Sequence, residues 1–316
     1  MGMPIAVYPG TQLTGASVMD LVTNPRAQVD AILALHERFH TPVLLTAMDL
    51  SAEAEAFGCS VRMEEGEIPT VTGRRATTAE EIRALPIPHP GDRRTGVHLE
   101  AAGRLVRLTN GSPVLGELIG PFSLAGRIFG VSESLELSAA EPELLEELLE
   151  KTTDFVLEYA CAFKQQGVHG VILAEPAAGL LSPRGLARFS SARVHRIVDE
   201  LQSDDFTIIL HNCGARLVHL PQILESGVAG VHFGAPMDMR AALSQAGEEV
   251  ILSGNLDPSA VFRSGTRQEV EAKAQELLSF AQGRWNFIPS SGCDLPLDTP
   301  LENMDAFFET LKGFAA

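Results

Sequence analysis

Short apolar runs that do not alternate with polar residues recur along this chain. Seven of them are rich in Val, Ile and Leu: Val43–Leu50, Pro113–Phe122, Gly170–Glu175, Phe206–His211, Ala229–Phe233, Val250–Ser253 and Trp285–Pro289. Runs of this kind are typical of strands buried on both faces of a parallel sheet. Because parallel strands need a crossover connection, which is usually a helix, the pattern restricts the chain to an α/β fold.

The segments between these runs have helical spacing. The clearest extends from Leu144 to Phe163 and ends at Gly167, directly before the run at 170–175. At least six strand-then-helix units follow one another without a Pro/Gly-rich linker. We therefore expect residues 1–316 to form a single domain, a (β/α)8 TIM barrel, with an irregular excursion or hairpin near 58–105.

Composition excludes several classes of function. The 316 residues are 45% hydrophobic and 21% charged, which is the balance of a globular protein, and their formal net charge is −17. This charge disfavours nucleic acid and anionic membrane surfaces as partners. The chain contains no apolar run of membrane-spanning length, and its start lacks the features of a secretory signal, so we expect a cytoplasmic protein.

Candidate metal ligands follow two of the apolar runs, where a barrel carries its chemistry. His211 and Cys213 come at the end of the fourth run, with Gly214 to permit a turn, and Cys293 follows the seventh. Two thiolates and one imidazole suit Zn²⁺ better than Mg²⁺ or Ca²⁺. The alternative is that both cysteines are small buried residues and that His211 is a hydrogen-bonded core group, and spacing alone leaves both open.

Other polar residues occur at the same predicted rim. Glu175 ends the third run and is placed to fill or guard a fourth metal position, or else to bind a loop as a strand-end carboxylate. Asn255 and Asp257 are candidate catalytic residues that can bind substrate or orient ligands, although Asp257 before a proline is equally an ordinary helix cap. We expect His219 to be solvated and His232 to line the pocket, neither being needed for the metal.

Five stretches of the chain are distinctive: MDLSAEAEAFGCSV at 48–61, IGPFSLAG at 119–126, ILHNCG at 209–214, SGNLDP at 253–258 and SSGCDLPLDTPLEN at 290–303. Together they resemble the uroporphyrinogen decarboxylase superfamily and, within it, the zinc-containing corrinoid-dependent methyltransferases, which include the methylcobamide:coenzyme M methyltransferases. The resemblance implies that His211, Cys213 and Cys293 bind Zn²⁺ and that a partner protein supplies a corrinoid (cobalamin).

The function expected from this resemblance is zinc-dependent methyl transfer between methylcobamide on a corrinoid protein and a small thiol such as coenzyme M, in methanogenesis or other one-carbon metabolism. An alternative is methyl transfer from a methyl ether or similar methylated small molecule to the corrinoid. A second alternative is uroporphyrinogen decarboxylase. That branch holds its polycarboxylate substrate with an N-terminal arginine motif, and the segment PIAVYPGTQLTG contains no arginine.

Overall fold

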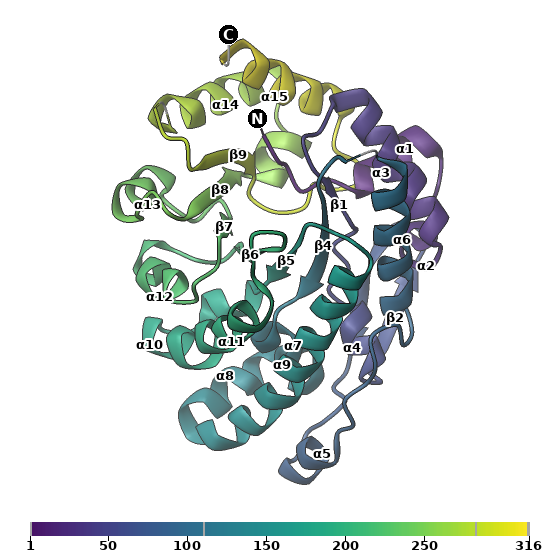
Figure 1. The fold of residues 1–316 in the computed structure, drawn as a ribbon, viewed down its shortest axis with the longest axis vertical. Helices are drawn as coiled ribbons and strands as arrows, with labels where there is room; N and C mark the ends of the chain where they lie inside the picture. Colours follow the sequence, from purple (N-terminus) through teal and green to yellow (C-terminus); the bar gives the residue numbers. More distant parts are fainter. Residues whose placement is uncertain (1, 110, 282, 315–316) are drawn as a thin grey trace.

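Seven parallel strands form one curled sheet at the centre of the computed structural model, which describes residues 2–109, 111–281 and 283–314 (Figure 1). In spatial order they are β1 (Leu44–Leu45), β4 (Val114–Ile119), β5 (Gly170–Ala174), β6 (Thr207–Asn212), β7 (Gly230–Phe233), β8 (Ile251–Leu256) and β9 (Phe287–Ser291). Each predicted run overlaps one of these strands, and the predicted α/β barrel class is confirmed.

Helices surround the outer face of the sheet (Figure 1). They are η1 (Tyr8–Gly10), α1 (Thr11–Thr14), α2 (Val18–Thr23), α3 (Pro25–Phe39), α4 (Ala52–Ala56), α5 (Ala79–Ala84), α6 (Thr95–Leu108), α7 (Pro121–Phe129), α8 (Val131–Ala140), α9 (Pro142–Gln165), η2 (Pro176–Leu180), α10 (Pro183–Leu186), η3 (Ala187–Ser191), α11 (Ala192–Leu201), η4 (Leu217–His219), α12 (Leu220–Leu224), α13 (Met239–Gln245), η5 (Pro258–Arg263), α14 (Arg267–Ala281) and α15 (Leu301–Phe314). Within the described ranges, no helix is both long and apolar enough to cross a bilayer.

Close packing of α9 on the sheet depends on a glycine. A Cβ atom at Gly116 of β4 would lie 2.5 Å from the Phe163 ring. Real side chains do not tolerate such a distance, so a larger residue here would push α9 away from the sheet. On α9, Phe155, Tyr159 and Phe163 are completely buried.

The chain near its N-terminus lies against the last strand of the sheet. Met3 N donates to Pro289 O at 3.0 Å, and Ile5 N donates to Ser291 Oγ at 3.0 Å. The side chains of Met3 and Ile5 belong to a small apolar cluster that fills the barrel interior: Met3, Ile5, Leu45, Met48, Leu115, Ile172 and Ala174. The barrel interior is thus a packed core, and residues 3–5 complete it on the β9 side.

The segment 58–105, expected to be an irregular excursion or hairpin, contains a hairpin, helix α5 (Ala79–Ala84) and most of helix α6 (Thr95–Leu108). Its first part is an antiparallel hairpin of β2 (Ser60–Glu64) and β3 (Glu67–Thr72). Thr78 and Glu81 then form a capping box that starts α5. From Thr95 onward α6 packs on α3 and β4 as one of the surrounding helices. The assignment of 1–316 to a single domain stays a prediction.

Candidate metal centre

His211, Cys213 and Cys293 meet at the carboxyl ends of β6 and β9. Their candidate ligand atoms all lie within 4.8 Å of one another, and Cys293 Sγ is 3.5 Å from His211 Nε2. On a tetrahedral Zn²⁺ with bonds of about 2.1 Å to nitrogen and about 2.3 Å to sulfur, the two donors would be about 3.6 Å apart. The donor set therefore fits a zinc ion in spacing as well as in chemistry.

The two thiols hold one negative charge readily. Hydrogen bonding from Cys293 is the main cause that lowers the pKa of Cys213 to about 4, and the proximity of His211 lowers it further. Donation to Cys213, together with burial, raises the pKa of Cys293. Loss of both protons thus needs a further positive charge, which a bound divalent cation would provide.

Strand register and two glycines allow the segments around His211, Cys213 and Cys293 to lie close together. His211 of β6 pairs directly with His232 of β7. A Cβ at Gly234 would lie 2.1 Å from the carbonyl oxygen of Cys213, so only glycine lets these two turns pass so closely. A Cβ at Gly292 would lie 2.8 Å from the backbone nitrogen of Ala235, which is a similar constraint beside Cys293.

A chain of hydrogen bonds determines which ring nitrogens carry protons. A carbonyl oxygen only accepts, so the Ser290 hydroxyl donates to Met3 O at 2.6 Å, and Ser290 Oγ accepts from His232 Nε2 at 2.8 Å. Burial lowers the pKa of His232 well below its usual range, which keeps this ring neutral. Its Nδ1 then accepts from His211 Nδ1 at 2.9 Å. The lone pair of His211 Nε2 therefore faces Cys293 and is available to a metal.

Glu175 lies apart from this group of three. The first turn of α7 binds its carboxylate: Phe122 N and Ser123 N donate at 2.9 Å each, and Ser123 Oγ donates at 2.7 Å. Burial raises the pKa of Glu175 to about 7 in spite of these bonds. Glu175 is thus a strand-end carboxylate bound by a helix terminus, and a role as a metal ligand stays a prediction.

Asn255 and Asp257 also lie outside the metal group. Asn255 Nδ2 donates to Gly234 O at 3.1 Å and to Met237 O at 2.7 Å, so it holds the turn that passes Cys213. Asp257 accepts from Ser259 N and Ala260 N at 2.8 and 2.7 Å and caps η5. Asp257 thus forms a helix cap, and Asn255 bonds to the backbone of the turn beside Cys213. The catalytic roles predicted for both residues stay predictions.

Several buried polar residues were missed or misjudged. His219, expected to be solvated, is only 6% exposed and accepts from Arg216 N at 3.1 Å, so that expectation was wrong. His232 was given no part in the metal site, yet it contacts a candidate ligand. Glu117 was not predicted as a site residue, although a lone charged residue within the apolar run of β4 is a signal that the sequence carries.

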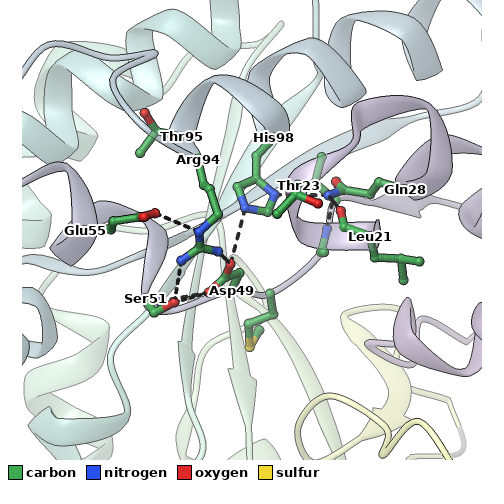
Figure 2. A network of polar contacts seen from close by, with 12 residues as sticks. Leu21, Thr23, Gln28, Asp49, Ser51, Glu55, Arg94, Thr95 and His98 are labelled. Atoms are coloured by element: carbon green, nitrogen blue, oxygen red, sulfur yellow. Dashed lines mark hydrogen bonds and ion pairs between the residues drawn. The ribbon is translucent and has the colours of Figure 1, made fainter. Parts of the chain in front are cut away.

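A second polar network lies at the mouth of the barrel, beyond β1 (Figure 2). Arg94 there pairs with Asp49 and Glu55, while His98 Nε2 lies 3.8 Å from an Asp49 oxygen. Burial alone would raise the pKa of Asp49, but the proximity of His98 and the charge of Arg94 lower it overall. Asp49 is therefore a buried carboxylate whose charge is already compensated.

Comparison with known families matches residues 5–314 to uroporphyrinogen decarboxylase (URO-D). The chain belongs to this family. The membership predicted from the five motifs is thus confirmed over nearly the whole chain.

Members of the uroporphyrinogen decarboxylase family with different names are similar to this chain. A methylcobamide:CoM methyltransferase of Methanosarcina acetivorans is 29% identical over 300 residues, which cover 92% of this chain and 87% of the relative. A uroporphyrinogen decarboxylase of Pseudoalteromonas atlantica is 26% identical over 330 residues, covering 100% and 90%. A solved methyltransferase from Methanosarcina mazei, 23% identical, superposes with a TM-score of 0.89 over 100% of this chain and 95% of its own, and shares the fold.

Proposed function

We propose that this protein is a zinc-dependent methyltransferase that moves a methyl group between methylcobamide on a corrinoid protein and a small thiol, a reaction of one-carbon metabolism. The observation that carries the proposal is the group of one imidazole and two thiols at the barrel mouth, with ligand atoms within 4.8 Å of one another. Similarity to a relative named methylcobamide:CoM methyltransferase supports the same reaction class.

The chain's own residues would prepare this centre in three ways. His211 Nε2, Cys213 Sγ and Cys293 Sγ would supply three ligands, which leaves one position for a substrate, as in other catalytic zinc sites. A Zn²⁺ ion held by these three residues would lower the pKa of a thiol in that position and so favour its nucleophilic thiolate form. His232 holds the His211 ring in the tautomer whose Nε2 binds metal, and Asn255 steadies the turn beside Cys213.

The decarboxylase alternative finds less support in the side chains. A substrate with many carboxylates needs free basic groups, and Arg94 is the one buried Arg or Lys among the described residues. Its guanidinium already binds Asp49, Ser51 and Glu55. The other alternative, methyl transfer from a methylated compound to Co(I) of the corrinoid, would use the same open metal position. The experiment below therefore measures transfer in both directions.

The proposal is tested by metal analysis and by cobalamin spectroscopy. Protein purified without chelator should contain about one zinc per chain, as expected for a single three-ligand site. Methylcobalamin with a small thiol should then yield cob(I)alamin, whereas cob(I)alamin with methylated compounds tests the opposite direction. Cys213→Ala should abolish zinc binding and transfer, while Cys161→Ala, which removes a half-buried thiol of α9, should affect neither. Absence of zinc even after its addition would refute the proposal.

A further inference from the structure

Glu117 is a buried carboxyl group without a partner. All six residues of β4 are buried, and Glu117 is 3% exposed. Within the part of the chain that the structure describes, neither of its carboxylate oxygens has a hydrogen-bond partner. Leu115, two residues earlier on the strand, belongs to the interior cluster, so the alternation of side chains turns Glu117 into the barrel as well. A buried polar group left unpaired is costly, and a retained one calls for an explanation.

Asp294 presents a second unpartnered carboxylate to the same space. It directly follows the candidate ligand Cys293, and neither of its buried oxygens forms a hydrogen bond with a described residue. Leu295 N donates to Ile5 O at 2.9 Å, and the side chain of Ile5 lies with that of Leu115 in the interior cluster. The segment that carries Asp294 therefore borders the same interior into which Glu117 points.

Arg94, the one buried Arg or Lys among the described residues, already binds other groups. Arg94 directs all its guanidinium nitrogens at other groups: Nε donates to Glu55 at 2.7 Å, Nη2 to Ser51 Oγ at 2.9 Å, and Nη1 to Asp49 (Figure 2). His98 in the same network faces Asp49 and Gln28. The pair of Glu117 and Asp294 therefore has unused acceptor oxygens but no free buried Arg or Lys, among the described residues, to match them.

We propose that Glu117 and Asp294 bind the ammonium group of a small aminothiol whose sulfur reaches the metal centre. The inference rests on the proposed function and names the substrate class of that site. An ammonium group brings one positive charge and three N–H donors, which match two carboxylates with unused oxygens. A thiol that ends in a sulfonate, as coenzyme M does, would bring a negative charge to the same carboxylates and would be repelled.

Three thiols with the same two-carbon spacing separate these possibilities: 2-aminoethanethiol, uncharged 2-mercaptoethanol and coenzyme M. Their binding to the zinc-loaded protein is measured by isothermal titration calorimetry, without cobalamin. We expect 2-aminoethanethiol to bind at least tenfold more tightly than 2-mercaptoethanol, which corresponds to about 1.4 kcal/mol. Coenzyme M should bind most weakly. Glu117→Gln and Asp294→Asn should each remove most of the preference for the amine.

A matched control and a stability measurement exclude a merely structural role. Glu53→Gln changes another buried carboxyl, one whose Oε1 accepts from Ile119 N, and it should leave the order of the three thiols unchanged. Glu117 has no hydrogen bond to lose, so Glu117→Gln should unfold at a temperature no lower than wild type. A large loss of stability in Glu117→Gln with the amine preference retained would overturn the inference.

The outcomes also separate this inference from the proposed function. If coenzyme M binds most tightly and accepts methyl from methylcobalamin, the ammonium assignment is wrong while the methyltransferase proposal stands. If 2-aminoethanethiol binds preferentially through Glu117 but no thiol is methylated, the subsite stands and the methyltransferase proposal fails. Equal binding of all three thiols, or no binding of any, overturns the ammonium subsite.

Discussion

Replacement of His232 by phenylalanine tests whether the hydrogen-bond chain behind His211 prepares the metal centre. The side chain stays aromatic, but the bonds of 2.9 Å to His211 Nδ1 and 2.8 Å to Ser290 Oγ are lost. His211 Nδ1–H then becomes a buried donor without an acceptor, which costs about 1–3 kcal/mol. The ring is also free to adopt the other tautomer or to rotate away from the two thiols.

The expected effect on zinc follows from these losses. Removing a partner that orients a metal-ligating histidine typically weakens metal binding about 10–100-fold, or by about 1.4–2.8 kcal/mol. Zinc affinity is measured by competition with a chromophoric chelator, and unfolding temperature is measured with and without zinc. The stabilisation that zinc provides should be smaller in His232→Phe than in wild type. His232→Gln, which can offer an oxygen to His211 Nδ1–H, should recover part of the affinity.

His219→Phe is the matched control, because it removes a buried imidazole that accepts from Arg216 N and belongs to no metal group among the described residues. It should reduce stability without changing zinc affinity. Wild-type affinity in His232→Phe, within a factor of about two, or an equal loss in both variants would refute the tautomer argument.

Three further changes test separate parts of the structure. Cys293→Ala should lose zinc and methyl transfer yet unfold cooperatively in a thermal scan, because the metal is added to a core that is stable without it; retention of zinc would disprove this ligand. Glu175→Gln turns an amide NH₂ toward the N–H groups of α7 and should lower the free energy of unfolding by about 1–3 kcal/mol in urea titrations, while zinc stays at one per chain; zinc loss at full stability would show a ligand instead. Burial raises the pKa of the Glu53 carboxyl group from 4.5 to about 8. The native state therefore favours the protonated form, and the stability that this form provides is fully present below about pH 4.5 and is lost as pH rises toward 8. Glu53→Gln should therefore gain stability relative to wild type between pH 5 and 8, by at most roughly 4 kcal/mol; a constant difference across that range would contradict the raised pKa.

The sequence predicted the fold because burial on both faces leaves a pattern in local composition. Each of the seven apolar runs contains or overlaps a strand, but boundaries were less certain: the run at 43–50 yields only Leu44–Leu45 as β1. The following residues leave the sheet and carry Asp49 into the network with Arg94. Helix α6 was missed because its buried face includes polar residues such as Thr95 and His98, which weaken an apolar pattern.

The candidate ligands were recognisable because strand ends in a barrel converge, so residues far apart in sequence share one rim. The residues that support these candidate ligands were harder to predict from the sequence. His232 acts through a register pair with His211 and through Ser290, whose hydroxyl is in turn bound by the backbone of Met3. No local pattern reveals such a chain, since it is assembled from four separate segments. Glu175 was easy to find but its role was not predictable from the sequence. A carboxylate at a strand end has the same position in the sequence whether it binds a metal or a helix terminus.

The contact between the N-terminal segment and β9 has a consequence for how the molecule matures. Ile5 N binds Ser291 Oγ across 286 positions, and Met3 O accepts the hydroxyl hydrogen that fixes the imidazole relay. During synthesis residues 3–5 must therefore wait for almost the entire barrel before they find their place. Until they do, the chain of hydrogen bonds behind His211 is incomplete, so a partly made polypeptide would lack the full arrangement behind the candidate metal ligands. Residues 3–5 thus tie assembly of the candidate metal centre to completion of the fold.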